Sequence, residues 1–408
     1  MVWCTRWTAC SCRRANKLSA CPMTQPFNPT PLASKPRRDA LKCLAALGLA
    51  PAAAWAQPGK SGAASRDMLV AQVVDVSPAQ QDVSKDFLIG SRAAWADINA
   101  KGGLRGRSVQ HVSVEVDGTP ESVRKALQSL LDNPACLVLS GTAGDPVASQ
   151  VSALLRQQSS GIAHVAPWLQ NSGADMDERS FPIFAARQEQ IVHAFKSLST
   201  LGVHEVGAVY ATPGDYAQYH DDLQRVAANM KLSLQTFRAN GDLSQLGRRL
   251  TANTAAILLF VGGTPELVQF TQGLEKQQRQ RYVVALADVN LQTMMQMGAA
   301  RSTPVIATQA VPMVNASLPV VRAYRETLAR LYDEPPVSLS LAGFIAARYT
   351  FEVLREMDGP LSRQSVLTAF QRRESRDVGG YRVTFNNQGR SATYVTQSML
   401  TQDGRVIG

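Results

Sequence analysis

From residue 69 onward, short apolar runs rich in β-branched residues alternate with longer stretches in which apolar residues recur every three or four positions. A short run of this kind predicts a strand covered on both faces, and the longer pattern predicts an amphipathic helix. Strands are predicted at 69–76, 112–116, 136–139, 162–165, 206–210, 232–237, 256–261, 282–285 and 305–308. Because strands and helices alternate, we predict an α/β fold of parallel sheets connected by crossover helices.

Two of the predicted helices have recognisable ends. Thr119-Pro120-Glu121 combines an N-cap residue, a proline in the first turn and an early acid, so a helix should begin there and reach Leu131. A second helix, 84–100, should stop at Gly102-Gly103, where glycine easily adopts a left-handed C-cap.

Towards the end of the chain, a long apolar helix is predicted at 340–357 and a short one from Arg363. Apolar and polar residues then alternate at 381–385 and 393–400. This period of two predicts strands, and we expect the two to form a closing antiparallel pair.

The chain has 408 residues, of which 45% are hydrophobic and 18% charged, which is enough for two domains with buried cores. Its formal charge is +10, but residues 1–56 hold eight Lys or Arg and one acid. The remainder carries 34 basic and 31 acidic residues. This near balance gives no reason to expect a nucleic-acid partner.

A cleavable signal peptide is predicted near the beginning. A basic segment, 35–42, precedes an apolar segment, 43–56, that ends in Ala54-Trp55-Ala56, and we expect cleavage after Ala56. The apolar run is shorter than the roughly 20 residues that span a bilayer, so we expect a periplasmic protein without stable membrane insertion. The adjacent Arg37 and Arg38 resemble a twin-arginine signal, and both this route and the general export route stay open.

The signal peptide would be complete if translation began at Met23, so both Met1 and Met23 remain candidate starts. Five of the six cysteines precede the predicted cleavage site, which leaves only Cys136 in the mature chain. A single cysteine forms neither an internal disulfide nor a Cys-based metal site. Its apolar neighbours predict a buried strand position.

Two segments resemble one family. Asp97-Ile-Asn-Ala-Lys-Gly-Gly103-Leu-Arg-Gly106-Arg107 and Gly379-Gly380-Tyr-Arg-Val-Thr-Phe385 are similar to segments of the type I periplasmic binding proteins of the leucine/isoleucine/valine-binding group, which serve ABC transporters. The similarity covers about 68–408. It implies two doubly wound lobes joined by three crossovers, with the ligand between them. The implied division is a signal peptide with its upstream extension at 1–56, a first lobe at 67–186 plus 314–374, and a second lobe at 187–313 plus 375–408.

The resemblance also implies ligand contacts in the loops that follow several strands. The matching positions are Ser77, Thr142, Ala143, Gly144, Trp168, Gln170, Tyr216 and Asp288. The loop 140–146 opens a helix, whose N-terminal N–H groups favour a carboxylate. Asp288 stands where amino-acid-binding relatives place an acid for the ligand ammonium.

Several of these positions also allow a purely structural interpretation. The loop around Thr142 has the residues of a tight turn before a helix, and Trp168 and Tyr216 are residue types that often pack in a core. Asp288 lies close enough to a helix beginning near Leu291 to be its N-cap.

The sequence gives no indication of an enzyme. Its five histidines lack metal-ligand spacing, and no Gly-x-Ser-x-Gly, phosphate-binding or dinucleotide-binding motif follows a strand. We therefore expect no cofactor and no metal, with an ABC permease as the implied partner. The expected ligand is a small carboxylate-bearing solute, with an amino acid first and an aromatic or other organic acid second. A receptor that presents its ligand to a membrane signalling kinase remains the other alternative.

Overall fold

The structure is a computed structural model of the chain. It describes residues 68–158, 161–170, 177–200, 202–299, 302–386, 389, 391, 394–401 and 403–408. The predicted signal peptide and its cleavage site lie outside these residues.

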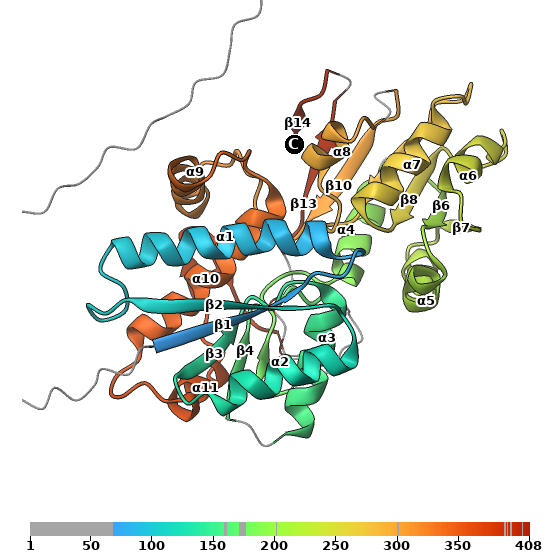
Figure 1. Cartoon of the computed structure of the whole chain (residues 1–408). Coiled ribbons are helices and arrows are strands. Elements are labelled where there is room, and N and C mark those ends of the chain that lie inside the picture. The colour runs from blue at the N-terminus through green and yellow to red at the C-terminus, as the bar shows by residue number, and fades with distance from the viewer. Residues whose placement is uncertain are drawn as a thin grey trace, which may run out of the picture. The chain divides into compact units, whose positions relative to one another are not determined.

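The first sheet has the strand order β2-β1-β3-β4-β5 and is parallel throughout (Figure 1). Its strands are β1 (Met68–Asp75), β2 (Val109–Val116), β3 (Cys136–Ser140), β4 (Ala163–Val165) and β5 (Ser180–Phe181). Every residue of β1 is buried, which explains its continuous apolar run. The order of strands changes direction at β1, because the next strand in sequence, β2, lies on one side of it and β3 lies on the other.

Helices cover both faces of this sheet. One core cluster lies under α2 (Pro120–Asp132) and α3 (Asp145–Gln157). The opposite cluster lies under α1 (Gln81–Ala100), α9 (Pro319–Leu331), α10 (Ser338–Glu356) and α11 (Arg363–Gln371).

The contact between α1 and α10 depends on a glycine in each helix. A Cβ at Gly90 would lie 1.7 Å from the carbonyl oxygen of Ser340, and a Cβ at Gly343 would lie 1.9 Å from that of Phe87. Both distances are far below van der Waals contact. Any larger residue would therefore push the helices apart.

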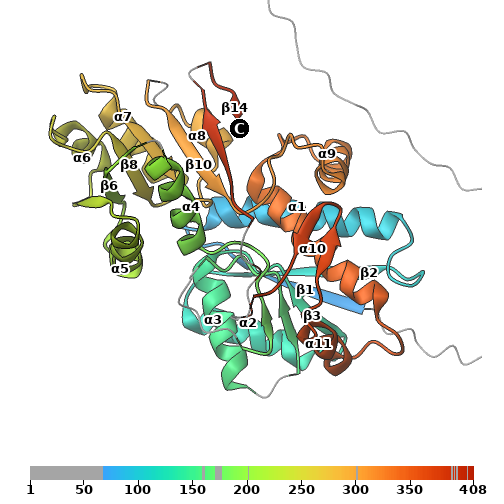
Figure 2. The same cartoon turned by 180° about the vertical axis from the view of Figure 1, so that it is seen from behind.

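The second sheet has the order β14-β13-β10-β9-β8-β6-β7 (Figure 2). Its strands are β6 (Glu205–Tyr210), β7 (Ser233–Arg238), β8 (Ile257–Val261), β9 (Tyr282–Ala285), β10 (Val305–Gln309), β13 (Thr396–Leu400) and β14 (Val406–Ile407). One face packs against α4 (Arg187–Thr200) and α5 (Pro213–Asn229), and the other against α6 (Leu243–Arg249), α7 (Thr264–Leu274) and α8 (Leu291–Gln296).

We call the five-stranded sheet with its helices the first lobe and the seven-stranded sheet with its helices the second lobe. The chain passes between them after β5, after β10 and after β12. The predicted α/β fold with parallel sheets is confirmed, and all nine predicted strands are present. The predicted lobe boundaries stay a prediction.

The predicted closing pair of strands is wrong. Residues 381–383 form β12 (Tyr381–Val383), which pairs with β11 (Arg376–Val378), whereas β13 pairs antiparallel with β10 and β14. Gly379 and Gly380 join β11 to β12 with φ values of 58° and 93°. A two-residue turn with positive φ at both positions favours a tight hairpin, so the nearer partner pairs with β12.

Candidate ligand-binding site

A cavity of about 230 Å³ lies where the carboxyl ends of strands from both lobes meet, and we call it the inter-lobe cavity. Open α/β sheets bind ligands at this edge. Loops after β1 and β3 contribute from the first lobe, and loops after β6, β8 and β9 contribute from the second. Its charged lining residues are Asp145, Arg187, Asp215, Glu266 and Asp288.

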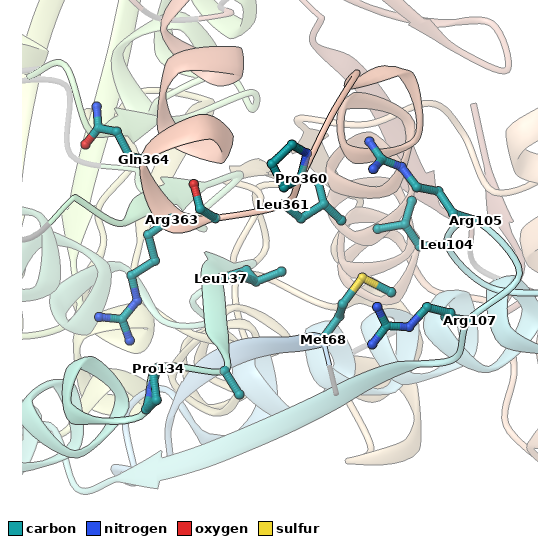
Figure 3. A pocket seen from close by; sticks show the side chains of 12 residues that line it. Met68, Leu104, Arg105, Arg107, Pro134, Leu137, Pro360, Leu361, Arg363 and Gln364 are labelled. Carbon is teal, nitrogen blue, oxygen red and sulfur yellow. The ribbon is translucent and has the colours of Figure 1, made fainter. Parts of the chain in front are cut away.

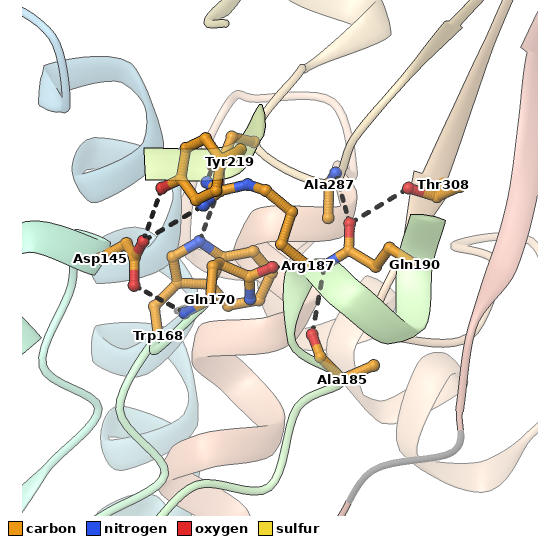
Figure 4. Close-up of polar contacts among 10 residues, drawn as sticks. Asp145, Trp168, Gln170, Ala185, Arg187, Gln190, Tyr219, Ala287 and Thr308 are labelled. Carbon is orange, nitrogen blue, oxygen red and sulfur yellow. Dashed lines mark hydrogen bonds and ion pairs between the residues drawn. The ribbon is translucent and has the colours of Figure 1, made fainter. Parts of the chain in front are cut away.

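Arg187, the first residue of α4, joins the two lobes (Figure 4). Its Nη2 lies 2.8 Å from Oδ2 of Asp288, and its Nη1 lies 3.4 Å from Oδ2 of Asp145. The guanidinium carbon stands 3.7 Å from the centre of the Tyr219 ring, whose hydroxyl donates to Asp145 (3.3 Å). One cation therefore serves a carboxylate from each lobe.

Burial and charge act in opposite directions on this cation. The Arg187 side chain is 9% exposed, and burial alone would lower its pKa. The neighbouring Tyr219, Asp288 and Asp145 outweigh burial, so the pKa is raised above its ordinary value. Arg187 therefore keeps its positive charge between the two carboxylates.

Gln190, one turn further along α4, makes a second connection between the lobes (Figure 4). Its Oε1 accepts from the backbone N–H of Ala287 (2.9 Å) and from the hydroxyl of Thr308 (3.1 Å), both in the second lobe. Its Nε2 donates to the carbonyl of Ala185 (3.1 Å) and to Oε1 of Gln170. Gln190 is fully buried, and these four bonds hold the first passage of the chain between the lobes.

Trp168 and Gln170 lie just behind the inter-lobe cavity. The indole N–H of Trp168 donates to Oδ1 of Asp288 (2.8 Å), while its ring packs against Phe87 and Phe184 with centroids 5.9 and 5.4 Å away. The backbone N–H of Gln170 donates to Oδ1 of Asp145 (2.7 Å). Trp168 thus combines a core ring with a polar tip that holds a carboxylate of the cavity.

Thr142, Ala143 and Gly144 are built into the end of the first sheet. Thr142 is fully buried, and its hydroxyl lies 2.8 Å from Nε2 of His164. Burial lowers the pKa of His164 to about 4, so the ring is neutral at physiological pH. A Cβ at Gly144, where φ is 98°, would lie 2.6 Å from Cβ of Asp75, so only glycine fits there. The next residue, Asp145, reaches the cavity.

Ser77 and Tyr216 lie outside the cavity lining given by the described residues. The backbone N–H of Ser77 donates to Oδ1 of Asp75 (2.9 Å). The ring of Tyr216 stacks on His220 at 4.4 Å, with the guanidinium of Arg238 3.2 Å from its centre. The tyrosine that does line the cavity is Tyr219, one turn later on the same helix.

Of the eight predicted contact positions, Asp288 is the one that lines the cavity among the described residues. Its alternative interpretation as a helix cap is wrong. Asn290 is the N-cap of α8, and its Oδ1 accepts from the backbone N–H groups of Gln292 (2.9 Å) and Thr293 (3.2 Å). Asp288 is instead bound by Arg187 and Trp168.

Asp145, Arg187 and Tyr219 line the cavity but were not predicted from the sequence. One local signal could have drawn attention to Arg187, because a cation in the first turn of a helix opposes the helix dipole. Such a residue needs another reason to be there, and here that reason is the pair of carboxylates.

A larger cavity of about 670 Å³ lies elsewhere, at the amino ends of β1 and β3 (Figure 3). We call it the outer pocket. Its walls include Met68, Leu104, Leu137 and Leu361, and its charged lining residues are Arg105, Arg107 and Arg363. It belongs to the first lobe alone and lies at the edge opposite the one where open sheets bind ligands.

Comparison with known proteins identifies the family. The periplasmic binding protein family matches residues 69–404. No curated protein matches the sequence. Within the described residues, we find no helix whose length and apolar character would let it cross a membrane.

Solved structures share the fold at low sequence identity. An extracellular ligand-binding receptor from Verminephrobacter eiseniae has a TM-score of 0.76 and 17% identity, covering 84% of this chain and 100% of that one. A fatty acid ABC transporter substrate-binding protein from Thermomonospora curvata has a TM-score of 0.74 and 14% identity over 84% and 90%. The branched-chain amino acid transporter protein LivJ from Streptococcus pneumoniae, in complex with isoleucine, has a TM-score of 0.70 and 12% identity over 84% and 98%. With a family match over most of its length and two lobes that enclose a cavity at the carboxyl ends of their strands, the chain belongs to the periplasmic binding protein family.

Proposed function

We propose that the chain is a periplasmic receptor that binds a small solute in the inter-lobe cavity and delivers it to the permease of an ABC transporter. The observation that carries this proposal is the cavity itself, whose charged lining comes from both lobes. Relatives of this fold include a protein crystallised with isoleucine and a fatty acid transport protein. A sensory role, in which the loaded receptor contacts a membrane kinase, would use the same cavity.

An amino acid is the first ligand class in this proposal, and an organic acid is the second. The carboxylate of either would lie near the start of α3, where Asp145 and Pro146 line the cavity and the helix N-terminus favours an anion. An ammonium group at Asp288 would share that carboxylate with Arg187 and Trp168. An organic acid would instead approach Arg187.

A thermal-shift screen tests the receptor function directly. A ligand that binds only the folded protein raises its melting temperature, and the gain grows with ligand concentration as ln(1 + [L]/Kd). We expect a shift with members of an amino acid panel and smaller shifts with organic acids. Small-angle scattering of the same samples should show compaction, because a ligand enclosed by two lobes favours the closed arrangement.

The control is Arg225→Met, which removes an exposed arginine of α5 that pairs with Asp222 at 3.0 Å and does not line the cavity. This variant should shift as the wild type does. A panel in which no solute raises the melting temperature, or a bound solute that leaves the radius of gyration unchanged, would contradict the proposal.

Export is the second part of the proposal. We expect the mature protein to begin at Gln57, after Ala54-Trp55-Ala56. Intact mass of protein released from the periplasm decides this. A mature chain that begins well before Gln57, or that keeps Cys43 with lipid attached, would contradict it.

A further inference from the structure

We infer that the solute of the inter-lobe cavity carries more positive than negative charge, and that Asp215 and Glu266 receive its cationic group. This inference rests on the proposed receptor function and adds the charge class of the ligand. It also assigns a different role to Asp288, which holds Arg187 in place.

The first step is the charge of the lining. Among the described residues, Asp145, Asp215, Glu266 and Asp288 face the cavity together with one cation, Arg187. The formal sum is three negative charges. A carboxylate ligand entering this cavity would meet an excess of its own sign.

The second step is the contribution of the backbone. Five helices, α1, α3, α4, α5 and α7, begin at the cavity. The first-turn acids of α3, α5 and α7 are Asp145, Asp215 and Glu266. Each N-terminus acts as about half a positive charge, so the five together offset about 2.5 of the three negative charges. The lining therefore keeps a net negative charge of about 0.5 by the same measure.

Two of the four carboxylates that line the cavity already have hydrogen-bond partners on both oxygens. Both oxygens of Asp145 and both of Asp288 already accept hydrogen bonds, from Gln170 and Tyr219 in the first case and from Trp168 and Arg187 in the second. All four carboxylate oxygens therefore have hydrogen-bond partners in the absence of a ligand. A ligand ammonium would gain little there unless it displaced Arg187.

Asp215 and Glu266 differ from that pair. Oδ2 of Asp215 accepts from the backbone N–H of Thr212 (3.1 Å) and from its hydroxyl (2.7 Å). Over the described part of the chain, no hydrogen bond or ion pair reaches Oδ1 of Asp215 or the carboxylate of Glu266. Burial raises the pKa of Asp215, and the charge of Asp288 adds to this, while Thr212 and Arg187 oppose it. A cation in the cavity would relieve this repulsion.

A further acceptor points the same way. Oε1 of Gln80 is buried and has no hydrogen-bond partner within the described residues, and Gln80 lines the cavity from the first lobe. A buried acceptor without a donor is costly, about 1–3 kcal/mol. Gln80 thus adds an unused acceptor to those of Asp215 and Glu266, and such a set of acceptors suits an ammonium or guanidinium with several N–H donors. A volume of about 230 Å³ limits the ligand to a small solute of this class.

Titration calorimetry at low ionic strength with lysine, norleucine and glutamate tests the inference. Lysine and norleucine have the same carbon skeleton and differ only in the second ammonium, while glutamate carries the opposite net charge. We expect lysine to bind about tenfold or more tightly than norleucine, the range for a hydrogen bond to a charged group, and glutamate to bind most weakly.

Variants locate the contact. In Asp215→Asn with Glu266→Gln the advantage of lysine over norleucine should fall below about threefold, because the charge pairs that produce it are gone. The single variant Glu266→Gln should show part of this loss and leaves the capping box of α5 intact. Asp222→Asn, a matched change on the outer part of α5, should keep the full advantage.

The outcomes separate the two proposals. Tighter binding of norleucine or glutamate than of lysine, or a lysine advantage that survives in the double variant, would overturn the charge class and leave the receptor function in place. Failure of every amino acid and organic acid to bind would overturn the receptor function and this inference with it.

Discussion

The inter-lobe cavity and the outer pocket carry opposite charges and hold them in different ways. In the inter-lobe cavity, Arg187 pairs with one carboxylate from each lobe. In the outer pocket, Arg363 donates to backbone carbonyls of Leu130, Leu131 and Cys136, where α2 ends and β3 begins.

This difference supports the inter-lobe cavity as the ligand site that we propose. A side-chain pair between lobes can exchange one partner for a ligand when the lobes separate. An arginine that caps the end of a helix keeps its hydrogen bonds in every arrangement of the lobes. The outer pocket is almost three times as large, yet its arginines have structural partners. By size alone, the outer pocket would be preferred.

The largest effect should come from Arg187→Met. Removing the cation leaves Asp145 and Asp288 buried without a counter-charge, and breaking a buried pair in this way costs about 3–5 kcal/mol. Urea unfolding measures the loss. Arg225→Met, which removes an exposed arginine, should stay within about 0.5 kcal/mol of the wild type. Equal stability of the two variants would show that the bridge between the lobes does not form in solution.

Arg363→Ala should have the next largest effect, about 1–3 kcal/mol, because several carbonyls at the end of α2 lose their donor. Ligand affinity should not change, since the outer pocket lies apart from the inter-lobe cavity. Arg363→Lys keeps the charge but not the fork of donors, so it should recover only a small part of the stability. A weakened ligand affinity in Arg363→Ala would show that the two cavities are coupled.

The stability of the protein should depend on pH through Asp86, a residue of α1 that forms a hydrogen bond with the second lobe. Burial raises the pKa of Asp86 to about 6, and its Oδ2 accepts from Nδ2 of Asn290 in the second lobe at 2.6 Å. Lys85 and the hydrogen bond from Asn290 lower this pKa, while Glu334 and Asp82 raise it. A raised pKa means that the folded state favours the protonated acid.

The cost of ionising Asp86 is therefore absent below pH 4, grows between pH 4 and 6, and is complete above pH 6. Asp86→Asn should gain stability relative to the wild type over this interval, by about 1–2 kcal/mol after allowance for partial exposure. Urea unfolding at pH 4 and pH 7 measures the gain. A constant difference between the two proteins at both values would show that Asp86 has an ordinary pKa.

The smallest effect should come from Arg105→Ala. This exposed arginine of the outer pocket donates to the carbonyls of Met357 and Gly359. Because water can replace the donors at an exposed site, the loss should be about 0.5–1 kcal/mol. A thermal melt is sensitive enough to detect it, and a loss above that of Arg363→Ala would reverse the order proposed for the two arginines.

The fold was predictable because strands buried on both faces leave continuous apolar runs such as 136–139 and 206–210. Strand pairing was less predictable. The strand at 381–383 pairs with the segment before it because Gly379 and Gly380 make a tight turn, a local feature that outweighed the expected partner at 393–400.

The candidate site was only partly predictable. Asp288 follows a strand end, and the resemblance to the binding proteins placed it at the edge of the sheet that lines the inter-lobe cavity. Arg187 and Tyr219 could not be placed, because their role depends on which carboxylates the other lobe brings to them. Contacts of this kind leave no periodic pattern of residues in the sequence around Arg187 or Tyr219.

The tight contact of α1 with α10 has a consequence for how the protein reaches its final state. Ser91 on α1 donates to the carbonyl of Gly343 on α10, 252 residues later in the chain. Contacts between such distant segments must wait until the loop between them closes, which slows folding. The first lobe is begun by the earliest strands but completed by a helix made after most of the second lobe, so a growing chain exposes the apolar face of α1 for most of its synthesis.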